Sequence, residues 1–381
     1  MPEPRISAGR VDIADDVVFG DGVVIECEEL AIGPGARIGI SDRDGFRTPA
    51  GVSIHVRSLQ LGPGVQIGPS VLMEGGAFEL GEGVRVLRHA TLQVTEHLRI
   101  GAGGTVNERA EISGRHVDIG QELWMLPGAK IGGGSAFENS SRLEAGHFLH
   151  LGVDTLVNTA RPVTIGHEVG LGTRTSIYTH GAYPSRLEGF PVAFDGVTIG
   201  DFSWVPGAVI NPGVSIGRNC VIGVNSLVTT DIPDGALAAG SPAKVIREHA
   251  YPKPLSGARV LDFYETFLNA YAGQLGVDAE AERDDARVVL RTGDATYVAG
   301  EPVVEAERTI MIGPGTSAAT GDGLTAMDTV TRRIAGMADG LSARFANELR
   351  RYGIRFYSRP RGNRYEDWTD EPPAFGPAPT T

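Results

Sequence analysis

His180, in the sequence SIYTHGAYPS, is the residue of this chain best suited to acid–base chemistry. Imidazole exchanges a proton near neutral pH, as the deprotonation of an attacking hydroxyl or amine requires. A loop histidine can also serve only to hydrogen-bond the backbone, and that structural alternative stays open. Glu138, Glu144 and Glu168 are candidates to orient the second ring nitrogen, and the sequence does not choose among them.

Three other histidines, His147, His150 and His167, raise the question of a metal site. A resemblance to the γ-class carbonic anhydrases, which bind metal through histidines of adjacent subunits, would require a pair at a fixed short spacing and a third ligand upstream. His147 and His150 are three residues apart, so on a strand they tend to point to different faces. No cysteine or carboxylate completes the ligand set, and we therefore expect no metal.

A six-residue repeat surrounds His180 and must build the element that positions it. An aliphatic residue followed by glycine recurs at Ile165, Leu171, Ile199, Ile216 and Ile222, and upstream at Ile32, Ile38, Leu61, Ile67, Leu80, Ile100, Ile119 and Ile131. This spacing fits neither an amphipathic helix nor an alternating sheet. It is typical of a parallel β-helix, in which each hexapeptide supplies one short strand and one corner. We expect one solenoid over residues 10–248, with loops at its corners.

The repeat region resembles the hexapeptide-repeat acyltransferases and is most similar to the branch that contains the maltose, galactoside and xenobiotic acetyltransferases. The phrases that carry the resemblance are VTIGDFSW, INPGVSIG, VIGVNSLVTTDIP and AAGSPAKVIR. The resemblance implies an all-β, left-handed parallel β-helix, usually a homotrimer, with acyl-coenzyme A in clefts between neighbouring subunits. The handedness rests on the resemblance alone, because left-handed crossovers break the usual chirality rule.

The resemblance also implies a place for the acceptor. In the family, one histidine follows a repeat that ends in I-x-T, and a loop then returns to V-T-I-G, as His180 and GAYPSRLEGFPVAFDG do here. That loop contains Tyr183 and is long enough to reach over a neighbouring subunit's groove. Asn158 precedes the coil of His180, where relatives place polar groups for a sugar acceptor, although it can equally belong to an asparagine ladder. We expect Asn158 and Tyr183 to bind the acceptor.

By the same resemblance, the donor lies against the last coils. Trp204 stands at a corner where the family carries an aromatic residue beside the donor groove, and it can equally cover the outside of the solenoid. Backbone N–H groups near Ser226 would hold the pantetheine amides and polarise the thioester, and Lys244 and Arg247 would meet the phosphates. The same residues are also needed to close the coils. The expected donor-binding residues are Trp204, Gly207, Val224, Asn225, Ser226, Thr229, Lys244 and Arg247.

Composition narrows the class of protein. The chain has 34 Lys and Arg against 47 Asp and Glu, and its formal net charge of −13 disfavours binding to nucleic acids or anionic membranes. Cys27 and Cys220 give no disulfide framework, and neither lies in a phrase that suggests a nucleophile. The sequence has no signal peptide and no apolar run near the ~18 residues of a membrane helix. We expect a soluble, cytoplasmic protein.

After Arg247 the repeat ends, and residues 249–360 are expected to form an α+β domain that caps the solenoid, holds the trimer together or walls the acceptor site. LDFYETFLNAYAGQLG is predicted to be a short helix, and DARVVLRTGDATYVAGEPVVEAERTIMIG two or three strands. A long helix is expected to carry Met327, Val330, Ile334, Met337, Leu341, Phe345 and Leu349. IRFYS is predicted to be a final strand, residues 361–381 a disordered tail and residues 1–9 an N-terminal segment.

These observations predict an acyl-CoA-dependent O- or N-acyltransferase that transfers an acetyl or other acyl group to a sugar, nucleotide-sugar or small natural product. His180 would deprotonate the acceptor, which attacks the thioester directly. Three alternatives remain: a non-catalytic β-helix scaffold or binding protein, a metal enzyme like the γ-class carbonic anhydrases, and a transferase that takes its acyl group from an acyl carrier protein.

Overall fold

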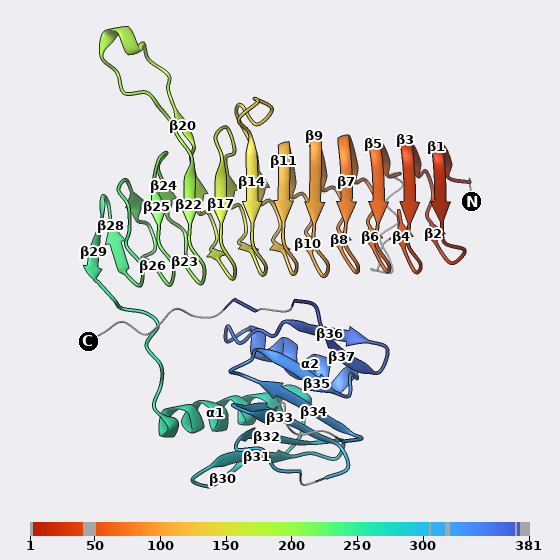
Figure 1. Ribbon diagram of the computed structural model, residues 1–381, viewed down its shortest axis with the longest axis vertical. Helices are drawn as coiled ribbons and strands as arrows, with labels where there is room; N and C mark the ends of the chain where they lie inside the picture. The colour runs from red at the N-terminus through yellow and green to blue at the C-terminus, as the bar shows by residue number, and fades with distance from the viewer. Residues whose placement is uncertain (1–2, 41–50, 305, 317–320, 370–371, 374–381) are drawn as a thin grey trace. The chain divides into compact units, whose positions relative to one another are not determined.

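The computed structural model describes residues 3–40, 51–304, 306–316, 321–369 and 372–373. The chain forms two compact units, one that extends to Lys253 and one from Pro254 to Ala374. The first unit is a stack of coils in which each strand pairs in parallel with the equivalent strand of the next coil (Figure 1). In the part of the chain that the structure describes, no helix is long and apolar enough to cross a membrane.

In the N-terminal half of the stack, each coil contains one long strand and one strand of two residues. The long strands are β1 (Arg5–Ile13), β3 (Val24–Ile32), β5 (Ser53–Leu61), β7 (Leu72–Leu80), β9 (Thr91–Ile100) and β11 (Glu111–Ile119). The short strands are β2 (Val18–Phe19), β4 (Arg37–Ile38), β6 (Gln66–Ile67), β8 (Arg85–Val86), β10 (Thr105–Val106) and β12 (Trp124–Met125). The stack therefore begins at Arg5, inside the segment that was expected to precede it.

In the C-terminal half, each coil contains three short strands. The change occurs after β11, which pairs with two separate strands of the next coil. One column is β13 (Lys130–Ile131), β16 (Leu156–Val157), β19 (Ser176–Ile177), β24 (Val209–Ile210) and β27 (Leu227–Val228). The second is β14 (Arg142–Ala145), β17 (Val163–Ile165), β22 (Val197–Ile199) and β25 (Ser215–Ile216). The third is β15 (His150–Leu151), β18 (Gly170–Leu171), β23 (Trp204–Val205) and β26 (Val221–Ile222), and the antiparallel strands β28 (Leu237–Gly240) and β29 (Ala243–Arg247) end the stack.

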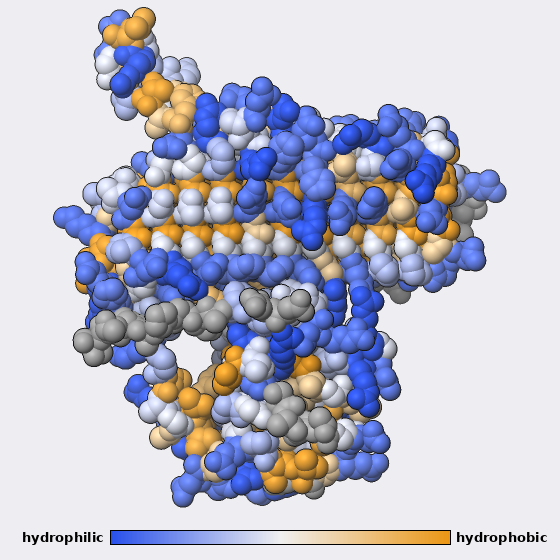
Figure 2. Space-filling view, in the orientation of Figure 1, coloured by the Kyte–Doolittle hydropathy of each residue, from blue (hydrophilic) through white to orange (hydrophobic). Residues whose placement is uncertain are grey.

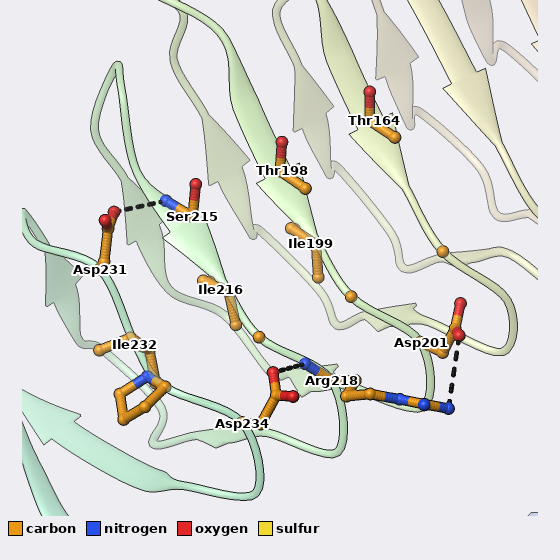
Figure 3. A pocket seen from close by; sticks show the side chains of 14 residues that line it. Thr164, Thr198, Ile199, Asp201, Ser215, Ile216, Arg218, Asp231, Ile232 and Asp234 are labelled. Carbon is orange, nitrogen blue, oxygen red and sulfur yellow. Dashed lines mark hydrogen bonds and ion pairs between the residues drawn. The ribbon is translucent and has the colours of Figure 1, made fainter. Parts of the chain in front are cut away.

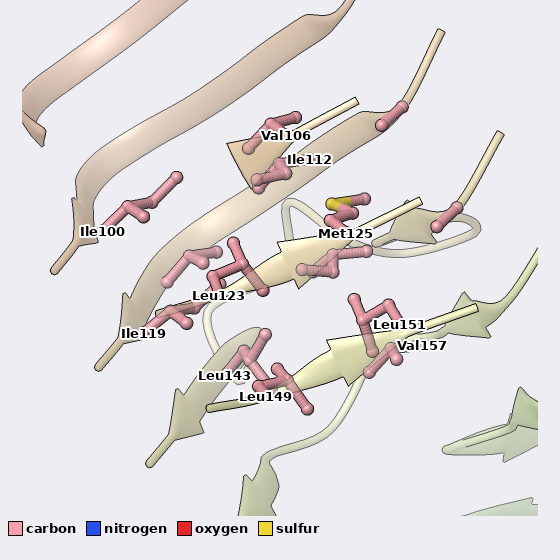
Figure 4. Packing of buried hydrophobic residues seen from close by; sticks show 14 of the residues in the cluster. Ile100, Val106, Ile112, Ile119, Leu123, Met125, Leu143, Leu149, Leu151 and Val157 are labelled. Atoms are coloured by element: carbon pink, nitrogen blue, oxygen red, sulfur yellow. The ribbon is translucent and has the colours of Figure 1, made fainter. Parts of the chain in front are cut away.

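The interior of the stack is filled by columns of aliphatic side chains, in which each residue lies on its equivalent in the next coil (Figure 4). Ile165 pairs with Ile199 and Ile199 with Ile216, and all three are buried. Each such side chain contributes about 1.5–3 kcal/mol of transfer free energy. The surface shows the same order, because side chains of similar hydropathy form rows along the stack (Figure 2). The aliphatic positions of the repeat are thus confirmed as core.

The glycine after each aliphatic residue is required by close approach between coils. A Cβ at Gly200 would lie 2.6 Å from the backbone N of Arg218 in the next coil. The left-handed residue of this corner is instead Phe202, with φ 58°. The role of this glycine is therefore to let two backbones approach closely.

A long hairpin leaves the stack after β19. Its base is formed by β20 (His180–Gly181) and β21 (Ala193–Phe194), which pair antiparallel, and a 3₁₀ turn, η1 (Arg186–Glu188), lies near its tip (Figure 1). We call residues 180–194 the arm. Tyr183 and Leu187 of the arm are 99% and 94% exposed.

The second unit combines helices with a six-stranded mixed sheet. In chain order it contains α1 (Gly257–Leu275), β30 (Glu282–Arg283), β31 (Arg287–Arg291), β32 (Thr296–Gly300), β33 (Thr309–Gly313), β34 (Leu324–Asp328), β35 (Arg333–Gly336), α2 (Gly340–Arg350), β36 (Ser358–Arg361) and β37 (Arg364–Asp367). Its core is aromatic, with Phe267, Tyr271, Tyr297 and Phe345 in mutual ring contact. The helix and the strands predicted between Leu261 and Gly313 are confirmed.

Three predictions for this unit differ from the structure. Met327 and Ile334 lie in the paired strands β34 and β35, so the long helix is reduced to α2. Gly336 has φ 93°, outside the helical region, and Asp339 caps the helix that follows. The predicted strand IRFYS contributes only its last residue, Ser358, to β36, and β37 lies inside the expected disordered tail. Local apolar spacing was misleading because the pairing of β34 with β33 and β35 connects separate parts of the chain.

Candidate active site

His180 begins β20 at the base of the arm, directly after the coil strand β19, and its ring is half-buried. Its Nδ1 lies 3.0 Å from Oδ1 of Asn158, which follows the equivalent strand, β16, of the preceding coil. The stacking of the two coils therefore brings together two residues that are 22 positions apart. None of the glutamates considered from sequence occupies this position.

Asn158 is 3% exposed, and its orientation is fixed by its neighbours. Its Nδ2 donates to the carbonyl oxygens of Gly132, at 3.3 Å, and Gly134, at 3.1 Å. Its Oδ1 accepts from Thr179 Oγ1, at 2.6 Å, and from the backbone N of Ala160, at 3.2 Å. Carbonyl oxygens can only accept, so the amide cannot be flipped. Oδ1 thus accepts a hydrogen bond from Nδ1–H of His180, and in this tautomer of the neutral ring Nε2 carries no hydrogen.

The segment before β14 forms one wall beside His180. Gly134 lies against the Nε2 edge of the ring, and Phe194 of β21 stacks on the imidazole at a centroid distance of 6.0 Å and an angle of 16°. The guanidinium carbon of Arg161 lies over the ring of Phe194, 5.0 Å from its centroid. Nη1 of Arg161 also donates to the carboxylate of Glu138, at 3.0 Å. The bond from Arg161, with a further one from Ser135, lowers the pKa of Glu138. Glu138 is therefore a carboxylate at the rim.

A separate pocket of about 580 Å³ lies at the corner before β19 and at the equivalent corners of the following coils. Four residues predicted to bind the donor line it: Gly207, Val224, Asn225 and Ser226. Sequence reasoning missed Thr173, Arg174 and Ser241, which line it too. Arg174 and Asn225 are equivalent corner residues with φ of 60° and 58°, so the register of the repeat contained a signal for Arg174.

The remaining predicted donor residues lie outside this pocket. Thr229 is exposed at the corner that follows β27, and Lys244 and Arg247 are exposed on β29. Trp204 is 42% exposed on β23 and its ring lies on Gly170, where a Cβ would be 2.4 Å from it. Tyr183, predicted to bind the acceptor, is 99% exposed on the arm and the structure does not bring it to His180. The N–H of Gly207 already donates to Thr175 Oγ1, at 2.9 Å.

The other histidines have structural partners. His147 Nδ1 accepts from the backbone N of Gln121, and His167 Nδ1 accepts from the backbone N of His147, both at 3.0 Å. Burial, followed by the nearby His167 and Arg99, lowers the pKa of His147 to about 4. His150 packs edge-on against Trp124. Among the described residues, no group of three or more His, Cys, Asp or Glu is placed to hold a metal ion.

Neither cysteine has the environment of a nucleophile. Cys220 is buried in the stack and Cys27 is half-buried near its start. Burial raises the pKa of both thiols, so the reactive thiolate is disfavoured at both positions.

A groove of about 630 Å³ follows the column of β17, β22 and β25, with the hydroxyls of Thr164, Thr198 and Ser215 in a row (Figure 3). Its carboxylates accept from backbone amides: Asp231 from the N of Ser215 and Asp234 from the N of Arg218. These acids brace the coil corners, and no predicted site residue lines this groove.

Known proteins resemble part of the chain. No family model matches it. It is 46% identical over 91 residues to a putative acetyltransferase of Saccharomyces cerevisiae, which covers 23% of this chain and 45% of that protein. It is 34% identical over 134 residues to galactoside O-acetyltransferase of Escherichia coli, which covers 34% of this chain and 63% of that protein. The chain thus spans less than two thirds of the length of either relative.

Two solved structures were also found to be similar to part of the chain. An acetyl-coenzyme A complex of a hexapeptide-repeat acetyltransferase from Vibrio cholerae is 24% identical, with a TM-score of 0.25, over 39% of this chain and 68% of that one. The UDP-N-acetylglucosamine acyltransferase of Arabidopsis is 16% identical, with a TM-score of 0.42, over 61% and 73%. At these TM-scores the similarity carries no conclusion about the site.

The similarity to curated acetyltransferases confirms the resemblance that the repeat phrases indicated. The two matches described above cover 23% and 34% of the chain. Over about a third of its length, this chain is similar in sequence to galactoside O-acetyltransferase.

Proposed function

We propose that this protein is an acyl-CoA-dependent acyltransferase that acylates a hydroxyl or amine of a sugar, nucleotide-sugar or small natural product. The observation that carries the proposal is the bond between His180 Nδ1 and Asn158 Oδ1, 3.0 Å long, made by an amide whose orientation is fixed. It holds the imidazole in the tautomer whose Nε2 accepts a proton, as a general base for acyl transfer requires.

In the proposed reaction, Nε2 of His180 removes the proton of the acceptor O–H or N–H while the heteroatom attacks the thioester carbonyl carbon. The tetrahedral intermediate collapses as the C–S bond breaks. The imidazolium then returns its proton to the departing coenzyme A thiolate, so that the enzyme regains its starting state. The charge of the imidazolium is stabilised by Asn158 Oδ1, which accepts from Nδ1–H throughout the reaction.

We propose that the donor binds in the pocket lined by Gly207, Val224, Asn225 and Ser226. Arg174 is the cation of this lining and suits the anionic coenzyme A. This pocket and His180 lie at opposite ends of β19. We therefore propose a homotrimer of left-handed β-helices in which the pocket of one chain faces His180 of its neighbour. The arm, which is fully exposed at Tyr183, suits such an assembly.

Calorimetric titration of the metal-free protein with acetyl-coenzyme A tests the donor. We expect saturable binding that is retained in His180→Ala and weakened by Val224→Glu, which adds a negative charge at a pocket residue that is 65% exposed. Release of free thiol in the presence of a panel of sugars and amines should then be about 10²–10⁴-fold slower in His180→Ala. Absence of donor binding would rule out the coenzyme A assignment and favour a carrier-protein donor or a scaffold.

A further inference from the structure

We propose that Gly134 is a specificity-determining position, whose missing side chain keeps open the acceptor's approach to Nε2 of His180. The inference rests on the proposed function, because it concerns the acceptor side of the same site. It adds a residue from a different coil, 46 positions before His180, that no motif of the sequence singles out.

The distances define what a side chain at this position would meet. A Cβ on Gly134 would lie 3.5 Å from Nε2 and 3.6 Å from Cε1 of His180. These are ordinary van der Waals distances, so a methyl group fits there without displacing the ring. However, an acceptor heteroatom has to come within about 2.6–3.2 Å of the base, and the carbon that bears it must occupy adjacent space. A methyl group beside Nε2 competes for that space.

The segment that contains Gly134 is held beside the imidazole of His180, because Asn158 is hydrogen-bonded to both residues. Its Nδ2 donates to Gly134 O at 3.1 Å, while its Oδ1 accepts from His180 Nδ1 at 3.0 Å. Farther along the same segment, Nη1 of Arg161 donates to Glu138 at 3.0 Å and to Ser140 Oγ at 2.9 Å. These hydrogen bonds therefore fix the distance between Gly134 and Nε2 of His180.

The backbone does not explain why residue 134 is glycine. Gly132 and Gly133 have φ of 115° and 105°, in the region that favours glycine, whereas Gly134 is not among the residues with positive φ. Alanine at 134 would meet no backbone strain of this kind. A side chain at position 134 would instead fill the space beside Nε2 of His180.

Gly134→Ala tests the proposal, with Gly181→Ala as its matched control. Gly181 is the residue after His180, it also lacks a positive φ, and a Cβ there meets nothing within 4 Å. Both variants should fold as the parent does. The first readout is the rate at which diethyl pyrocarbonate modifies His180, measured by peptide mass spectrometry. This reagent needs a neutral, accessible ring nitrogen, and Asn158 covers Nδ1, so the rate reports access to Nε2 without donor or acceptor.

We expect modification of His180 to be several-fold slower in Gly134→Ala than in the parent and in Gly181→Ala. We also expect kcat/KM for the best acceptor to fall by about tenfold, with a larger loss for secondary than for primary alcohols and an unchanged Kd for acetyl-coenzyme A. Equal modification rates in the two variants would overturn the inference. The two hypotheses can fail separately. If modification is slower in Gly134→Ala but the parent protein transfers no acyl group, the restricted access to Nε2 is supported and the proposed function is rejected.

Discussion

At the scale of single residues, an asparagine occupies the place that a carboxylate takes in many histidine-dependent enzymes. Asn158 is 3% exposed and faces the carbonyl oxygens of Gly132 and Gly134. A buried carboxylate would be repelled by these oxygens, whereas an amide donates to both and still presents Oδ1 to His180. The proposed base is therefore oriented without burying a charge.

Asn158→Ala should lower kcat by about 10–100-fold while leaving the Kd for acetyl-coenzyme A unchanged, because Nδ1 of His180 loses its acceptor and the ring its preferred tautomer. Nitrogen NMR of the labelled imidazole should show a smaller share of Nδ1–H. Asn211→Ala is the control, since Asn211 follows β24, the equivalent strand of the next coil. An Nδ1–H share that stays at the parent's value would contradict the positioning role.

Residue chemistry alone indicated His180, since imidazole was the side chain matched to the reaction. The family resemblance singled out Asn158, but as a candidate for acceptor binding. The partner of Nδ1 could not be predicted because it depends on how one coil lies on the next, and the glutamates were chosen for charge without that register. Arg174 was missed for a related reason: it is equivalent to Asn225 only when corners of successive coils are aligned.

At the scale of elements, the corners that follow Gly120, Gly146 and Gly166 are held by a ladder of side-chain acceptors. His147 accepts from Gln121 N, His167 from His147 N, and Asp201 from His167 N, at 3.0, 3.0 and 2.8 Å. Each side chain thus satisfies a backbone donor of the preceding coil. An unprotonated imidazole nitrogen is required for this at His147.

Stability should fall as the pH drops from about 6.5 to about 4. The pKa of His147 is lowered to about 4, chiefly by burial, so protons bind more tightly to the unfolded chain in this window. The full shift would be worth about 3 kcal/mol, and we expect about 1–2 kcal/mol because the ring is partly solvated.

Denaturant unfolding at pH 7.5 and pH 5 measures this effect against His147→Asn. The variant keeps an acceptor for Gln121 N but does not titrate. Its loss of stability between the two pH values should be smaller than that of the parent, and equal losses would show that His147 is not responsible.

Gly200→Ala should destabilise the first unit by about 1–3 kcal/mol, because the new Cβ would lie 2.6 Å from Arg218 N and 2.8 Å from Gly217 C, both backbone atoms that cannot rotate away. The midpoint of denaturant unfolding measures the change. Gly181→Ala, with nothing within 4 Å of its Cβ, should stay close to the parent. If the two variants unfold alike, the glycine after the aliphatic residue is not needed for stacking.

At the scale of the whole molecule, the six-residue repeat predicted the parallel stack, because each aliphatic position contacts its own equivalent in the next coil. The second unit has no such repetition. Its strand β34 pairs with β33 and β35, and the apolar spacing of Met327 and Ile334 suits a helix equally well. The distinction required the three-dimensional partners of these residues, which the sequence around them does not contain.

Mixing two impaired variants, at a donor concentration too low for Val224→Glu to bind it, tests the proposed trimer. His180→Ala lacks the base and Val224→Glu disturbs the donor pocket. If each site takes these parts from neighbouring chains, a 1:1 mixture refolded together should recover about a quarter of the parent's activity, since one site in four then receives both intact parts. A mixture that stays inactive would place both parts in the same chain.

The in-register pairing of the coils also makes the length of the stack a quantity that can change in whole steps. Residues 72–90, from the start of β7 to the residue before β9, make up one complete turn. β5 pairs with β7 in one register, and β9 pairs with β7 with a single shift between Gly75 and Ala77. A chain that lacks this turn should still fold and bind acetyl-coenzyme A like the parent, as circular dichroism and calorimetry would show. Duplication or deletion of the gene segment for a single turn can therefore change the distance between the N-terminal end of the stack and the candidate site, while both keep their own structure.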